Sequence, residues 1–190
     1  MKKKATNSEI LKQVIYEMLT LAHAVEHLVK KKWVKGYSHI DSSEPILSIA
    51  AIKMSILYDF LYTKKADQRE YGTSDYYTAI DDFNVKIPVP KLAGCGPKGM
   101  FTKESVIKHI VYLSEERITK SKEVQEPRFK GGVDSILKNC SVILSNAEFF
   151  IDTLVTSSFI NLNLEGENYL KDYKLTIARL KEVPTLTESF

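Results

Sequence analysis

The sequence is poor in cysteine, glycine and proline, and no long run of it is uninterruptedly apolar. Its 190 residues include two cysteines, eight glycines and six prolines. The cysteines, Cys95 and Cys140, are too far apart along the chain to form a metal-binding pair, so we expect reduced thiols in a cytoplasmic protein. No apolar run reaches the length of a membrane span, and no apolar signal core follows the basic start of the chain. We therefore expect neither a membrane segment nor a secretion signal.

An excess of charge of one sign is also lacking. Lysine and arginine number 27 against 24 aspartates and glutamates, which gives a formal net charge of +3. That charge is too mild to indicate a nucleic-acid-binding protein by itself. Hydrophobic residues make up 44% and charged residues 27% of the chain, which is typical of a soluble globular protein. The length fits a single domain spanning 1–190.

Long stretches between the few glycines and prolines have apolar residues at every third or fourth position, the period of a helix. We expect an all-α bundle of about five helices within one α-helical domain. The helix over about 45–61 is apolar on almost its whole circumference, so we expect it to be the central, buried one. Asn7 or Ser8 would cap the first helix. The expected helices cover about 7–32, 45–61, 102–121, 133–159 and 165–181, with a shorter one over about 75–83.

One long irregular loop, about 84–101, interrupts this pattern with three prolines and three glycines in NVKIPVPKLAGCGPKGMF. Loops of this length are often functional. It contains Gly94-x-Gly96-x-x-Gly99, the spacing of a dinucleotide-binding fingerprint. The fingerprint requires a preceding strand, whereas Pro88 and Pro90 precede it here in helical surroundings. We therefore expect a glycine-rich surface loop and no cofactor, with a nucleotide cradle as the alternative.

A second motif, His23-x-x-Glu26-His27, fits the signature of inverted zinc peptidases, in which the histidines hold zinc and the glutamate activates water. Glu104 lies at roughly the separation of the third ligand. On a helix, however, His23 and His27 project about 140° and about 180° from the centre of the apolar stripe. Zinc ligands on a bundle helix normally face inward. We expect two exposed histidines that bind no metal, and a zinc hydrolase remains a minor alternative.

The segment ESVIKHIVYLSEERITK, residues 104–120, places an arginine on the apolar face of a helix. Ser114 lies beside Arg117, and His109 lies at the flank. A guanidinium on a core-facing stripe needs partners, because burying it alone is costly. Asp59 on the helix over 45–61 would be a structural partner. Alternatively, Arg117 and His109 would face a groove that binds phosphate or RNA, since arginine suits phosphate and histidine can transfer protons near neutral pH.

Three segments in sequence order resemble consecutive blocks of bacterial HEPN-like proteins (higher eukaryotes and prokaryotes nucleotide-binding). They are AIKMSILYDFLYTKK, DYYTAIDDFN and ESVIKHIVYLSEERITK, and the likeness covers about 45–120. The resemblance implies an α-helical bundle that is often dimeric. Many members are ribonucleases, or components of antiphage and toxin–antitoxin systems. Their chemistry uses an arginine followed four to six residues later by a histidine, and both act on the RNA phosphodiester.

This sequence departs from the family at the catalytic positions. No arginine here is followed at that spacing by a suitable histidine. Lys53, Met54 and Ser55 stand where relatives carry a histidine and an arginine on the first of these helices. Tyr112 stands where relatives carry another histidine. The residues that carry over are Lys108, His109, Leu113, Ser114 and Arg117.

We therefore predict an intracellular HEPN-like bundle that binds RNA, a nucleotide or a partner protein without catalysis, in a defence or toxin–antitoxin type system. The resemblance favours a homodimer. Lys108, Ser114 and Asp59 are the candidate binding residues. The alternative is a metal-independent ribonuclease in which His109 performs acid–base catalysis and Arg117 stabilises the phosphate charge.

Overall fold

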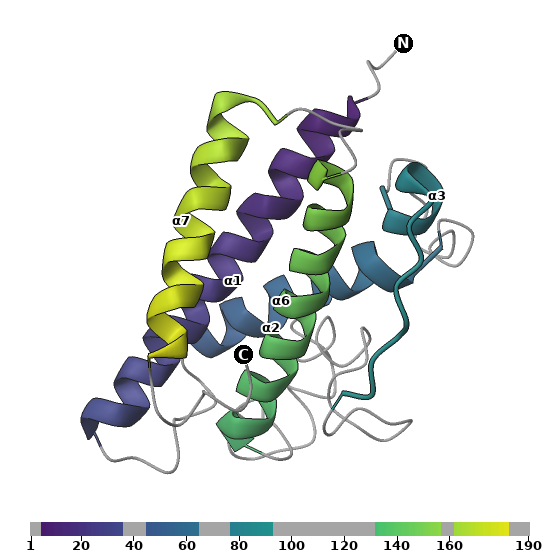
Figure 1. The fold of residues 1–190 in the computed structure, drawn as a ribbon. Coiled ribbons are helices and arrows are strands. Elements are labelled where there is room, and N and C mark those ends of the chain that lie inside the picture. The colour runs from purple at the N-terminus through teal and green to yellow at the C-terminus, as the bar shows by residue number, and fades with distance from the viewer. Residues whose placement is uncertain (1–4, 36–44, 65–76, 93–131, 157–161, 183–190) are drawn as a thin grey trace.

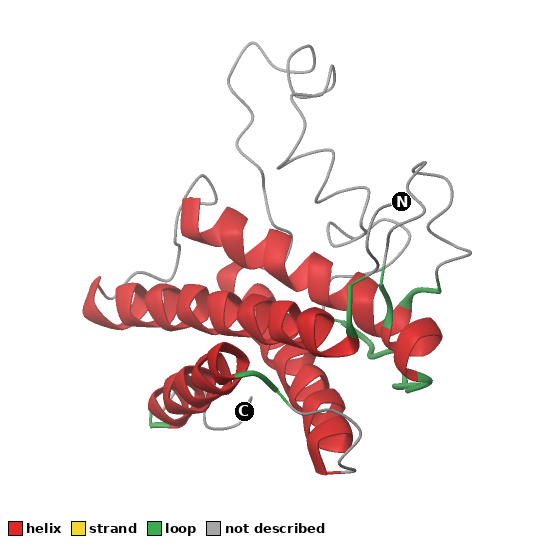
Figure 2. Cartoon of the chain, turned by 90° about the horizontal axis from the view of Figure 1, so that it is seen from above, coloured by secondary structure: helices red, strands yellow, loops and turns green. Residues whose placement is uncertain are grey.

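The computed structural model describes residues 5–35, 45–64, 77–92, 132–156 and 162–182, and these ranges hold five α-helices and no strand. The predicted all-α bundle of about five helices is confirmed, and every described element is a helix or a connecting loop (Figure 2). The helix expected over 102–121 lies outside the described residues, and the short helix supplies the fifth. The helices are α1 (Asn7–Lys35), α2 (Pro45–Tyr62), α3 (Ala79–Phe83), α6 (Gly132–Thr156) and α7 (Leu164–Lys181).

Helix α1 is the centre of the bundle, because α2, α6 and α7 all pack against it (Figure 1). Its apolar residues are buried on every side that faces these neighbours. Between residues 10 and 30 one narrow strip stays open to solvent, and its exposed members are Gln13, Tyr16, His23, His27 and Lys30.

The expectation that the helix over 45–61 would be the central one was wrong. Although α2 is apolar almost all round, Ile49 and Ile56 on it are exposed. Its buried positions face α1 and α6, and its C-terminal end also contacts α3. Among the described helices, one with this composition therefore packs beside the central helix and keeps two of its isoleucines exposed.

Helix α2 bears on the expectation of no membrane span, which stays a prediction. Over its 18 residues the mean hydropathy is 1.4, so by length and composition alone it would be able to cross a membrane. Seven of its residues are buried in the bundle. The core helix of a bundle and a membrane span share this composition, so the hydropathy does not distinguish them.

Helices α1 and α7 run parallel and in fixed register. Lys12 pairs with Glu165, and Glu26 pairs with Arg179. Each pair is separated by 153 positions in the sequence. Because the separation is the same at both ends, the two helices run in the same direction. The chain between them must therefore return to the end of the bundle where α1 begins. The side of α7 that packs inward carries Gly166, Tyr173, Thr176, Ile177 and Leu180, which follow helical spacing.

The start of α1 is fixed by a capping box at Thr6, and not by Asn7 or Ser8 as expected. The Thr6 hydroxyl accepts a hydrogen bond from the Glu9 backbone N–H at 3.3 Å, and the Thr6 N–H donates to the Glu9 carboxylate at 2.7 Å. This reciprocal arrangement satisfies two donors that a helix N-terminus otherwise leaves free. The sequence Thr-x-x-Glu carried the signal for it.

Helix α3 is shorter than the expected 75–83 because its cap is Thr78. The Thr78 side chain accepts a hydrogen bond from the Asp81 N–H at 3.1 Å. At the other end, Asn84 adopts the left-handed conformation, with φ 54°, which asparagine tolerates better than most residues. The Val85 N–H then bonds to the Ala79 carbonyl at 3.0 Å. Residues 84–92 contain no helix, as expected for the first part of the 84–101 loop, and its remainder lies outside the described residues.

Three phenylalanines from three helices pack together at the core. The ring of Phe150 on α6 meets Phe60 on α2 at a centroid distance of 5.2 Å and Phe83 on α3 at 5.4 Å. Both contacts are edge-to-face, the arrangement that the ring quadrupoles favour. These ring contacts pack the short α3 against α2 and α6.

Candidate functional site

Most of the site residues predicted from sequence lie outside the described residues. They are Lys108, His109, Ser114 and Arg117. Asp59 is described: it is half-buried near the C-terminal end of α2, and its carbonyl accepts a hydrogen bond from the Thr63 N–H at 3.1 Å. The predicted pairing of Asp59 with Arg117 stays a prediction.

The two histidines of the His23-x-x-Glu26-His27 motif are both exposed on the open strip of α1, as the helical projection predicted. Glu26 behaves differently, because its side chain turns toward α7 and is only 13% exposed. The motif is therefore split between two directions: its histidines face solvent and its carboxylate faces the seam between two helices.

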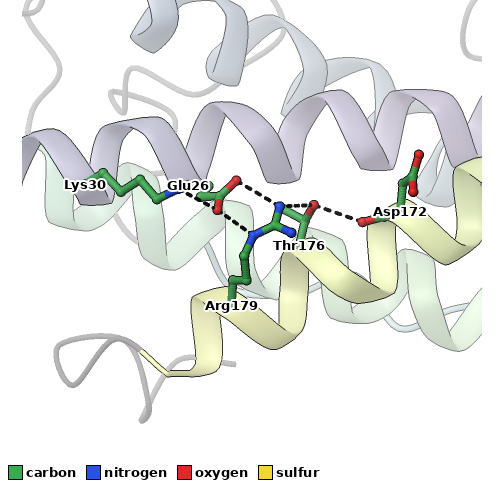
Figure 3. A network of polar contacts seen from close by, with 5 residues as sticks. All are labelled: Glu26, Lys30, Asp172, Thr176 and Arg179. Atoms are coloured by element: carbon green, nitrogen blue, oxygen red, sulfur yellow. Dashed lines mark hydrogen bonds and ion pairs between the residues drawn. The ribbon is translucent and has the colours of Figure 1, made fainter.

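Glu26 is the centre of a polar network across the α1–α7 seam (Figure 3). The guanidinium of Arg179 donates to both of its oxygens, Nε at 2.8 Å and Nη2 at 3.3 Å. Lys30 donates to the same carboxylate at 2.9 Å. Arg179 also donates to the Thr176 hydroxyl at 3.0 Å, and that hydroxyl donates to the Asp172 carbonyl at 2.9 Å. The network holds the C-terminal half of α7 against α1.

The network changes what the Glu26 carboxylate can do chemically. Hydrogen bonding from Arg179 is the largest influence and, with Lys30, lowers the pKa of Glu26 from 4.5 to about 2 against the opposing effect of partial burial. A general base works best with a pKa near the operating pH. With a pKa near 2, Glu26 would be a weak base, and its donors occupy the lone pairs that would receive a proton from water. The water-activating role in the zinc-peptidase hypothesis does not fit this carboxylate.

A shallow cavity of about 260 Å³ lies beside the network, at the end of the α1–α7 seam. Two carboxylates and two cations line it over an apolar floor, so the charges balance within the cavity. The C-terminal end of α7 contributes to its wall, and the dipole there disfavours an anionic ligand. The lining residues are Glu26, Val29, Lys30, Arg179, Leu180 and Glu182.

A second cluster lies further along the open strip, where α1 meets α7. The rings of Tyr16 and Tyr169 are 5.6 Å apart between centroids and tilted at 54°. The Tyr169 hydroxyl donates to Glu165 at 2.7 Å, and the same carboxylate receives Lys12 at 3.0 Å. These bonds lower the pKa of Glu165, with the Tyr169 hydrogen bond as the first cause, and raise the pKa of Tyr169. A charged Glu165 and a neutral Tyr169 suit a structural contact rather than proton transfer.

The third polar contact joins α1 to α2 beneath the same tyrosine. The Lys53 ammonium lies 2.7 Å from one carboxylate oxygen of Glu17, and Gln13 donates to the other oxygen at 2.8 Å. The contact between Lys53 and Glu17 is an ion pair rather than a hydrogen bond. The ammonium also lies 5.9 Å from the centroid of the Tyr16 ring, within reach of a cation–π attraction.

Burial holds one thiol and two tyrosine hydroxyls in their neutral forms. Burial raises the pKa of the Cys140 thiol to about 12 and raises the pKa of Tyr173 strongly. Burial also raises the pKa of Tyr62 to about 12, although a hydrogen bond from the Asn146 amide at 2.6 Å opposes the shift. A thiol of this pKa carries almost no thiolate at neutral pH and is a poor nucleophile. Among the described residues, no group of three or more His, Cys, Asp or Glu side chains could hold a metal ion.

Sequence reasoning missed both inter-helix clusters, Glu26–Arg179 and Tyr16–Tyr169. Each depends on the register between α1 and α7, and helical periodicity within one segment carries no information on that register. The equal separation of the two charged pairs would have been the available signal, since parallel helices place residues with the same offset side by side.

Comparison of the chain with protein-family models, with curated proteins and with solved structures gave no match. The class that the fold defines is therefore an all-α helical bundle, and the HEPN-like resemblance stays an expectation carried by its three sequence segments.

Proposed function

We propose that this chain is a noncatalytic binding module whose ligand is a partner protein. The observation that carries the proposal is the exposure of large apolar side chains on α1 and α2 within the described residues, where Tyr16 and Ile56 are each 42% exposed and Ile49 is 38% exposed. Aromatic and large aliphatic residues are the usual anchors of protein interfaces. The environment of the titratable groups described above supports binding rather than proton transfer.

The positions at which HEPN relatives carry a helix histidine and arginine have structural roles here. Lys53 forms the ion pair with Glu17, and Met54 is buried, with its sulfur 3.9 Å from the Cys140 thiol. Neither side chain is free to act on a phosphodiester. This supports a noncatalytic module of HEPN-like type.

A protein partner is favoured over RNA by the charge pairing around the tyrosines. Single-stranded RNA would require unpaired cations that replace its counterions. Four described cations along the α1–α7 seam and at Tyr16 instead lie within 3.0 Å of a glutamate oxygen. Displacing those glutamates would offset much of the gain from a phosphate contact. The paired cations are Lys12, Lys30, Lys53 and Arg179.

The proposed setting follows from the resemblance. We place the module in the cytoplasm, as part of a defence or toxin–antitoxin type system, and we include a homodimer in the proposal. The ribonuclease that uses His109 and Arg117 is the competing function, and the measurements below separate it from the binding module.

Binding of a fluorescent single-stranded RNA at 150 mM salt tests the choice of partner class. We expect a dissociation constant no tighter than about 1 µM, the range of nonspecific electrostatic binding. Nanomolar binding that falls in Lys108→Ala or Arg117→Ala would contradict the proposal. The matched control is Lys174→Ala, an exposed lysine on the outer side of α7.

A further inference from the structure

Helix α7 is attached to the other described helices mainly through one neighbour. It packs closely against α1, and none of the other described helices shares a comparable interface with it (Figure 1). Only five of its 18 residues are buried, and most of the others are exposed. Helices α1, α2 and α6 each pack against at least two described helices. Among the four long helices described, α7 therefore depends most on a single interface.

The other described helices form a connected set without α7. Helix α2 packs against α1, α6 and α3, and α6 also packs against α1. The three phenylalanines that meet in the core lie on α2, α3 and α6. Separation of α7 from α1 would therefore leave the principal contacts among the remaining described helices intact.

The apolar part of the α7 interface is short. The large apolar side chains of α7 that are buried are Tyr173, Ile177 and Leu180, and they span about two helical turns. In the first turn the buried residue is Gly166, which has no side chain to bury. Apolar burial therefore holds mainly the C-terminal half of α7 against α1.

Ion pairs that are open to solvent hold both ends of α7. In the first turn, Glu165 pairs with Lys12, and 54% of the Glu165 side chain is exposed. In the last turn, Arg179 pairs with Glu26, and 50% of the Arg179 side chain is exposed. Ion pairs as exposed as these contribute little to stability, and salt screens them. The attachment of α7 is therefore expected to be weaker than the packing of α1, α2 and α6.

We propose that α7 is a detachable helix, which separates from α1 as one unit while α1, α2, α3 and α6 remain packed. The two ion pairs at its ends set how often it separates. Separation uncovers the side of α1 between Lys12 and Glu26, where three buried apolar residues follow at helical spacing. They are Ile15, Leu19 and Ala22. This conformational device goes beyond the proposed binding function and does not require it.

Separation has a measurable consequence in the backbone of α7. An isolated helix of this length is only marginally stable in water. When α7 leaves α1, we therefore expect it to lose its backbone hydrogen bonds and its amide hydrogens to exchange with solvent. The protection of these amides against exchange then reports how often the helix opens.

Hydrogen–deuterium exchange of the full chain, read out by mass spectrometry of its peptides, tests the inference. Peptides from α7 are expected to have protection factors at least about tenfold lower than peptides from α6, because α7 opens without global unfolding. Sodium chloride at about 1 M shortens the screening length to about 3 Å. We expect this salt to lower the protection of α7 further and to leave that of α6 unchanged.

A matched pair of variants tests the role of the ion pairs. Arg179→Ala removes the partner of Glu26, and we expect it to lower the protection of α7 about threefold, as for the loss of an exposed ion pair. The protection of α6 should not change. Lys174→Ala, at an exposed position of α7, also replaces a long cation with alanine and is the control. It is expected to leave both helices as they are.

Four results would overturn the inference. Equal protection of α7 and α6 would mean that α7 leaves only when the whole bundle unfolds. Exchange of α7 at the rate of an unstructured peptide would mean that it is not docked on α1. An equal loss of protection in α6 on Arg179→Ala would mean that the ion pair stabilises the whole bundle. Unchanged protection of α7 in both high salt and Arg179→Ala would mean that the ion pairs do not control its opening.

Discussion

The carboxylate of Glu26 shows how one residue type serves different purposes according to its neighbours. In sequence it belongs to a zinc-peptidase motif, and in the fold it is the acceptor for Arg179 and Lys30 on the seam with α7. Its lowered pKa follows from those two cations. The same side chain would be a water-activating base only if it faced a metal and had fewer donors around it.

Replacing Glu26 with glutamine is expected to lower the free energy of unfolding by about 1 kcal/mol at pH 7, the value of a partly exposed ion pair. The pKa of Glu26 is lower in the folded state, about 2, than its ordinary value of 4.5. As pH falls, the unfolded chain therefore binds the proton first, and the stabilisation is lost between about pH 4.5 and 2. Urea denaturation of both proteins at pH 7 and near pH 2 measures this.

The control for that experiment is Glu167→Gln, an exposed carboxylate in the first turn of α7. It is expected to change the unfolding free energy by less than about 0.5 kcal/mol, as for a surface substitution. A Glu26→Gln difference that persists unchanged near pH 2 would contradict the assigned ion pair.

Cys140 is expected to resist alkylation in the folded protein. Its side chain is fully buried, and its pKa is raised to about 12. Reaction with iodoacetamide at pH 8, followed by peptide mass spectrometry, should leave Cys140 unmodified until denaturant is added. Labelling of Cys140 at the rate of a free thiol in native protein would show that α6 does not pack as described.

The exposed histidines lead to a prediction about zinc. His23 and His27 face solvent while Glu26 is bound to Arg179, so the motif offers no inward-facing ligand set on α1. Adding equimolar zinc is expected to leave the melting temperature unchanged, both in the natural chain and in His23→Ala/His27→Ala. A zinc-dependent rise in melting temperature that the double variant abolishes would restore the metal-site hypothesis.

At the level of elements, the helical spacing of apolar residues predicted four of the five described helices and their approximate bounds. The expected bounds of 7–32, 45–61, 133–159 and 165–181 agree with α1, α2, α6 and α7 to within about one turn where the chain is described. The spacing of apolar residues predicts these bounds because each helix buries one face along its length. The arrangement of the helices was less predictable. Helix α2 is apolar on almost all sides, yet α1 and not α2 lies at the centre of the bundle.

Helix α6 offers the sharpest test of the packing, because two adjacent phenylalanines have opposite environments. Phe150 is fully buried against Phe60 and Phe83, whereas Phe149 is 61% exposed. Phe150→Ala is expected to cost about 3–5 kcal/mol of unfolding free energy through lost burial and a cavity. Phe149→Ala should stay within about 0.5 kcal/mol. Equal costs for the two, measured by chemical denaturation, would contradict the orientation of α6.

At the scale of the whole molecule, the sequence predicted the fold class but not the inter-helix contacts. The parallel register of α1 and α7 joins Lys12 to Glu165 and Glu26 to Arg179 across 153 positions. Such contacts depend on how the connecting chain returns, which local periodicity does not encode. The candidate site drawn from sequence, around His109 and Arg117, lies outside the described residues.

The absence of catalysis is the central claim, and an RNA cleavage assay tests it most directly. Purified protein is incubated with an end-labelled structured RNA in the presence of EDTA, beside His109→Ala prepared identically. We predict that cleavage by the natural chain stays at the rate of the protein-free control over several hours. Cleavage well above that rate, abolished in His109→Ala, would contradict the claim and establish the ribonuclease instead.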